Sequence, residues 1–73
     1  MNLNELKTKE SATVINILGG DGVKRRLETL GIRPGKSLVK LSAHFWRGPV
    51  TVLLGKTKIA IGHGMANKII VEK

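Results

Sequence analysis

The chain has 73 residues, and its 13 Lys and Arg against 5 Asp and Glu give a formal net charge of +8. A chain of this length buries only about 60% of its unfolded surface, so we expect one small domain over residues 1–73 and no buried catalytic cleft. Cysteine is absent, which excludes disulfides and thiolate chemistry and is consistent with a reducing cytosol. No segment has the apolar length of a signal peptide or a membrane span.

The chain begins with a polar leader. Its two isolated apolar residues, Leu3 and Leu6, are expected to lie across the end of a barrel. The β-branched run that starts at Thr13 then predicts a first strand over residues 13–18, which Gly19 and Gly20 end.

A short helix is expected next, over residues 22–30. Val23, Leu27 and Leu30 recur at helical spacing, and Asp21 is expected to cap the first turn with its carboxylate. Gly31 suits the left-handed residue that closes a helix. The following Arg33–Lys36 segment has proline and glycine where a type II turn requires them.

Four further strands are predicted in the second half, over residues 37–43, 50–54, 57–61 and 69–71. In the first of them Val39, Leu41 and Ala43 share one face, whereas Lys40 and Ser42 share the other with Leu38. A loop carrying Phe45 and Trp46 follows that strand, Gly55 and Lys56 form a hairpin turn, and one helical turn over 65–68 precedes the last strand.

The connections between these strands are too short for parallel crossovers. A mainly β fold is therefore predicted, a small, partly closed SH3-like antiparallel five-stranded barrel with one short helix after the first strand, because closure removes exposed strand edges. An OB-fold is the nearest alternative, but its helix normally lies between the third and fourth strands, where this chain has only Gly55 and Lys56.

Candidate metal ligands are few. His44 and His63 are weak candidates for binding ferrous iron or zinc, because neither has a partner at ligand spacing. No cofactor is expected, although transient binding of Fe²⁺ or Zn²⁺, including at a weak site shared between two copies, is left open.

The basic residues point to a macromolecular partner. Lys24, Arg25 and Arg26 form the only run of cations, and Trp46 beside Arg47 combines residue types that dominate protein interfaces. Stacking of nucleic-acid bases is the competing use of Trp46, but a chain with so few aromatic residues offers a sparse platform.

Residues 19–35, with the sequence GGDGVKRRLETLGIRPG, resemble the signature of the FeoA family of ferrous iron transport proteins. The similarity continues through Gly48–Val50, Gly55, Ile59–Ile61 and the segment from Met65 to Val71. It departs from the family at Gly62, where many members carry an arginine.

The resemblance implies a cytoplasmic, non-enzymatic accessory protein of ferrous iron uptake. Its implied partner is the FeoB-type membrane permease, whose cytosolic portion is a GTP-binding domain, and it would reach the membrane only through that partner. On this basis we expect the helix and the Arg33–Lys36 turn to form a binding face, with Lys24, Arg25 and Arg33 as charged contacts and Trp46 as an anchor. A nucleic-acid-binding or repressor-type SH3-like module is the alternative.

Overall fold

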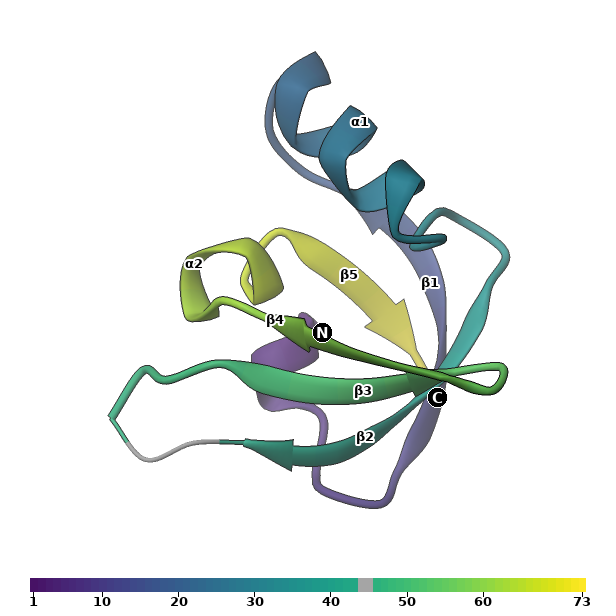
Figure 1. Cartoon of the computed structure of the whole chain (residues 1–73), viewed down its shortest axis with the longest axis vertical. Helices are drawn as coiled ribbons and strands as arrows, with labels where there is room; N and C mark the ends of the chain where they lie inside the picture. The colour runs from purple at the N-terminus through teal and green to yellow at the C-terminus, as the bar shows by residue number, and fades with distance from the viewer. Residues whose placement is uncertain (44–45) are drawn as a thin grey trace.

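A computed structural model describes residues 1–43 and 46–73. It contains one five-stranded antiparallel sheet in the order β4-β3-β2-β1-β5, together with three short helices (Figure 1). The elements in chain order are η1 (Leu3–Glu5), β1 (Ser11–Ile17), α1 (Asp21–Thr29), β2 (Ser37–Ala43), β3 (Val50–Leu54), β4 (Thr57–Ile61), α2 (His63–Ala66) and β5 (Ile69–Glu72).

The predicted strands are confirmed, with small differences at their ends. β2, β3 and β4 have the predicted bounds. β1 begins earlier than residue 13, because Ser11 already pairs with Val39 of β2. The helical turn before β5 begins at His63 instead of residue 65.

The sheet curls toward a barrel, but it is not closed. β4 and β5 are its two ends, so the five strands form a partly closed barrel, as predicted, and both end strands have an outer edge. The leader covers the edge of β5, since Val71 donates its backbone N–H to Met1 O at 2.8 Å and Asn2 forms a bridge with Ile70. The edge of β4 has no such cover among the described residues.

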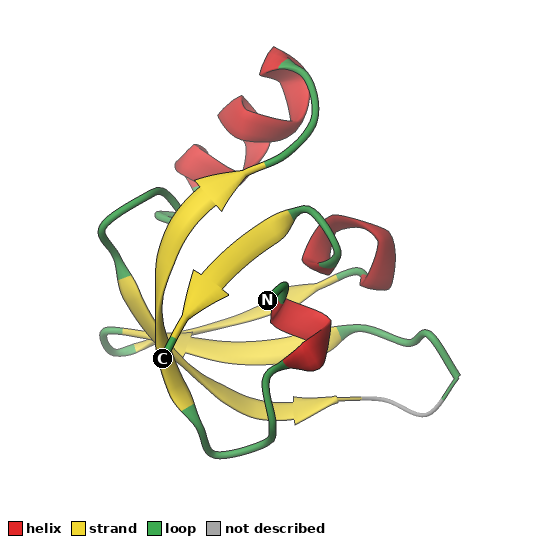
Figure 2. Ribbon diagram, turned by 180° about the vertical axis from the view of Figure 1, so that it is seen from behind, coloured by secondary structure: helices red, strands yellow, loops and turns green. Residues whose placement is uncertain are grey.

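The core fills the concave side of the curled sheet. Leu3 and Leu6 are both buried, as predicted, and η1 lies against α2 and β5 (Figure 2). Leu3 and Leu6 form one hydrophobic cluster with Leu27 of α1 and with the inward-facing side chains of all five strands. The leader is therefore part of the domain, and its two leucines complete the core.

The ends of α1 differ in one respect from the prediction. Gly20 is the N-cap and Asp21 is the first helical residue, with no capping hydrogen bond from a side chain. Asp21 still lies in the first turn, where the helix dipole favours a carboxylate. At the other end, Gly31 (φ 89°) and Gly35 (φ 94°) adopt the left-handed conformations expected of them.

The buried face of β2 is the face that carries Leu38 and Lys40, whereas Val39 and Leu41 are only partly buried. The Lys40 ammonium lies beneath the leader and donates to the carbonyl oxygens of Leu3 (3.2 Å), Asn4 (3.1 Å) and Leu6 (2.6 Å). Burial lowers the pKa of Lys40. The three carbonyl oxygens take the place of the water molecules that would accept hydrogen bonds from an exposed ammonium.

A second contact joins the leader to the C-terminus. Glu10 accepts a hydrogen bond from the Lys7 backbone N–H at 2.8 Å and pairs with the Lys73 ammonium at 3.0 Å. The bond from Lys7 and then the Lys73 ammonium lower the pKa of Glu10. No helix of the described residues is long and apolar enough to cross a membrane.

Candidate functional site

The helix α1 presents a cationic surface to solvent. Leu27 is its one buried residue, and Val23 packs partly against the core, so the other side of the helix is free. Lys24, Arg25 and Arg26 are all exposed. Within residues 1–43 and 46–73 the single ion pair joins Lys73 to Glu10, so none of these three cations is neutralised by a salt bridge.

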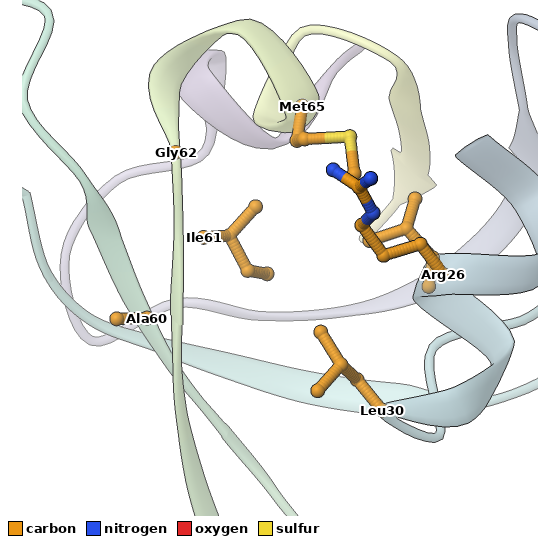
Figure 3. A pocket seen from close by; sticks show the side chains of 7 residues that line it. Arg26, Leu30, Ala60, Ile61, Gly62 and Met65 are labelled. Atoms are coloured by element: carbon orange, nitrogen blue, oxygen red, sulfur yellow. The ribbon is translucent and has the colours of Figure 1, made fainter. Parts of the chain in front are cut away.

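An apolar groove runs beside α1, where the sheet stays open at β4. We call it the α1–β4 groove; its volume is about 200 Å³, and it is lined by Arg26, Leu27, Leu30, Ala60, Ile61, Gly62 and Met65. Figure 3 shows the side chains of Leu30, Ile61 and Met65 directed toward one another, with the Arg26 guanidinium near Met65. No acidic residue lines the groove.

Only one face of α1 is buried, through Leu27 and partly Val23, which leaves the rest of the helix outside the core. Gly31 ends α1 in a left-handed turn, after which Ile32 is buried again in the core. Leu30, the last apolar residue of the predicted helical stripe, does not reach the core and remains 44% exposed. Leu30 therefore adds apolar surface to a concave site, the kind of place where ligands bind.

The predicted partner-binding residues occupy two separate regions. Lys24 and Arg25 lie on α1, and Arg33 is exposed on the turn that leads from α1 to β2. Trp46 is 88% exposed, but it follows the end of β2, whereas Arg33 precedes its start. The structure therefore groups Lys24, Arg25 and Arg33 around α1 and places Trp46 at the opposite end of β2.

The described structure brings no set of metal ligands together around His63. His63 is half-buried at the start of α2, and His44 lies outside the described residues. Among the residues described, no three His, Asp or Glu side chains come together as a metal site would require. Transient binding of Fe²⁺ or Zn²⁺ stays a prediction.

Sequence reasoning missed the groove and the buried lysine. Leu27 and Leu30 were both expected on the inner face of the helix, but periodicity alone gives no distance between that face and β4. For Lys40, alternation along β2 places it on one face with Leu38 and Ser42, and the apolar Leu38 is the one sign within the strand that this face is buried.

The chain matches the family model described as the FeoA domain over residues 1–73. It is 38% identical over 66 residues to a candidate Fe²⁺ transport protein A of Methanocaldococcus jannaschii, a match that covers 90% of this chain and 78% of the relative.

Solved structures of FeoA proteins have the same fold. A crystal structure of an iron uptake regulatory protein (FeoA) is 31% identical, with a TM-score of 0.88 and coverage of 97% of this chain and 92% of the other. Stenotrophomonas maltophilia FeoA, solved with zinc and described as an SH3 domain protein, is 28% identical, with a TM-score of 0.82 and coverage of 99% and 89%.

A manganese-dependent transcriptional repressor shares the fold alone, at 20% identity and a TM-score of 0.89 over 41% of its chain. The SH3-like architecture predicted from the sequence is thus shared with transport proteins and with repressors. Because the family match spans the entire sequence, and the M. jannaschii relative is similar along most of its own length, the chain belongs to the FeoA family.

Proposed function

We propose that this protein is a cytoplasmic, non-enzymatic accessory factor of ferrous iron uptake, acting as a single domain over residues 1–73. It binds the cytosolic GTP-binding domain of a FeoB-type permease. Membership of the FeoA family supports the link to iron transport, as does the M. jannaschii relative named for Fe²⁺ transport. The S. maltophilia protein is described as a candidate activating factor of ferrous iron transport, which supports the regulatory role.

The observation that carries the proposal is the unneutralised cationic surface of α1 beside an apolar groove. Lys24 and Arg25 are exposed and without salt-bridge partners in the described residues. Such charges accelerate encounter with an acidic partner and fix its orientation, whereas apolar contacts supply most of the affinity.

In this proposal Lys24, Arg25 and Arg33 contact acidic side chains of the permease domain. Trp46 is a second anchor, at the other end of β2, for a partner large enough to reach both regions. This protein binds one conformation of the permease more tightly than another, so binding shifts the permease toward that conformation. No covalent step is required of this chain.

A charge-reversal experiment tests the α1 surface. The variant Lys24→Glu/Arg25→Glu lowers the net charge by four, and so does the control Lys7→Glu/Lys9→Glu in the leader, where both lysines are also exposed. We expect the first variant to weaken binding of the soluble GTP-binding domain at least tenfold in isothermal titration calorimetry. The control should weaken it much less.

Both variants change the total charge equally, so the comparison separates the position of the charge from its amount. Circular dichroism and thermal unfolding check that each variant is folded. Equal affinities of the two variants for the GTP-binding domain would contradict a docking role for α1. Absence of binding by the unaltered protein would contradict the partner itself.

A further inference from the structure

The outer edge of β4 has free backbone groups. β3 and β4 are joined by a two-residue loop and pair in the register Leu54↔Thr57, Val52↔Ile59 and Val50↔Ile61. In an antiparallel hairpin with such a loop, the pair next to the loop is hydrogen-bonded and every second pair after it is too. Thr57, Ile59 and Ile61 therefore direct their N–H and C=O groups toward β3.

It follows that Lys58 and Ala60 direct their backbone groups away from β3. β4 ends the sheet, and among the described residues these groups have no backbone partner on any other element. Both residues are exposed. An edge of this kind can pair with a strand from another chain.

The α1–β4 groove lies along the same edge. Ala60, Ile61 and Gly62 form its β4 side, and Leu27, Leu30 and Met65 supply apolar surface opposite them. A strand added to β4 would alternate its side chains between the inner and outer faces of the sheet. Those on the same face as Ile61 would enter the groove, whose volume of about 200 Å³ exceeds the ~150 Å³ of an apolar cavity that binds benzene.

The charges around this edge favour an acidic partner over a second copy of this chain. Lys56 and Lys58 are exposed on and beside the β3–β4 hairpin, and Arg26 lies in the groove. A second copy of this chain would bring the same lysines together across a β4–β4 pair, at a net charge of +8 for each molecule. Like charges opposite one another oppose pairing, whereas acidic side chains beside Lys58 favour it.

We propose that the edge of β4 binds an extended acidic segment of a partner protein as an additional strand, with alternate apolar side chains of that segment in the α1–β4 groove. The inference rests on the proposed function, and it names the chemistry of a segment that the partner would present. Because Lys24 and Arg25 do not line the α1–β4 groove, one surface can fail its test while the other passes.

A short peptide tests the edge directly. A fluorescein-labelled peptide of alternating Asp and Leu is titrated with the full-length protein, and fluorescence anisotropy reports binding. We expect saturable binding of one peptide per chain. A peptide of the same composition, with the leucines in one block and the aspartates in another, should bind at least tenfold more weakly.

N-methylation of the peptide backbone distinguishes strand addition from simple charge attraction. One peptide is methylated at the Asp amides and another at the Leu amides, so each loses the donors along one edge only. In antiparallel pairing the Asp amides face β4, and in parallel pairing the Leu amides do. One methylated peptide should therefore bind at least tenfold more weakly, and the other should bind like the parent. Loss in both peptides or in neither would overturn the proposal.

Variants of the protein locate the site. Lys58→Glu should weaken peptide binding at least tenfold more than the matched surface variant Lys7→Glu does. Leu30→Ala removes half-exposed apolar surface from the groove and should also weaken binding. Equal effects of Lys58→Glu and Lys7→Glu would place the peptide elsewhere.

The outcomes separate this inference from the proposed function. If the alternating peptide does not bind but the GTP-binding domain does, strand addition to β4 is wrong and the proposed function stands. If the peptide binds but the GTP-binding domain does not, the β4 edge is a binding site and the proposed partner is wrong.

Discussion

Lys40 is the one buried charged residue among those described, and its replacement should lower stability. Its side chain is only 4% exposed and bonds three carbonyl oxygens of the leader. Lys40→Met keeps most of the aliphatic length but removes the ammonium donor from all three carbonyls, of which Leu3 O keeps only the Leu6 N–H, and we expect a loss of about 2–4 kcal/mol in the free energy of unfolding. Urea denaturation measures it. The control Lys56→Met, at an exposed position, should stay within about 0.5 kcal/mol of the unaltered protein, and equal effects of the two variants would show that the three bonds contribute nothing.

The sequence predicts the position of this lysine in a strand but not its burial. Alternation along residues 37–43 correctly separates two faces, and the face with Val39 and Leu41 is the more apolar in composition. The structure buries the other face, where Leu38 joins the core and carbonyl oxygens of the leader accept hydrogen bonds from Lys40. That arrangement depends on a contact between residues far apart in the chain, which no local pattern contains.

At the scale of single elements, two glycines in and next to α1 should respond in opposite ways to replacement by alanine. Gly22 lies within the helix, and an added Cβ would meet nothing within 4 Å, so Gly22→Ala should raise the free energy of unfolding by about 0.5–1 kcal/mol. Gly31 has φ +89°, and an added Cβ would lie 2.9 Å from Leu54 Cδ2. Gly31→Ala should therefore lower the free energy of unfolding by about 1–3 kcal/mol. Thermal and urea unfolding of both variants check the opposite signs, and stabilisation by Gly31→Ala would refute the left-handed turn.

The elements were largely predictable because their signals are local. β3, β4 and the turn between them follow from β-branched alternation around Gly55, and the left-handed Gly31 and Gly35 follow from the chemistry of helix ends and turns. The N-cap was misplaced at Asp21, one residue late, because glycine and aspartate are both accepted there. For the candidate site, the exposed cations were predicted, whereas the groove was not, because it depends on the distance between α1 and an edge strand.

For the whole molecule, the net charge of +8 determines how association should respond to salt. Exposed charges are screened over about 10 Å at 0.1 M ionic strength, so attraction at long range weakens as salt rises while packed apolar contacts do not. For the GTP-binding domain we expect the association rate constant to fall at least tenfold between about 0.02 and 0.5 M salt, with little change in dissociation. Surface plasmon resonance measures both rate constants. The Lys24→Glu/Arg25→Glu variant should show a shallower dependence than Lys7→Glu/Lys9→Glu.

The same titration with mixed oligonucleotides distinguishes the proposed function from the nucleic-acid-binding alternative that the sequence left open. A nucleic-acid-binding protein would bind tightly at physiological salt, and its affinity would fall steeply because each phosphate contact releases a counterion. We expect only weak attraction to oligonucleotides that is lost by about 0.15 M salt, since the cations outside the α1 run are spread singly along the chain. Tight binding at that salt concentration, with a steep slope that Lys24→Glu/Arg25→Glu reduces, would instead show that the cationic surface of α1 binds nucleic acid.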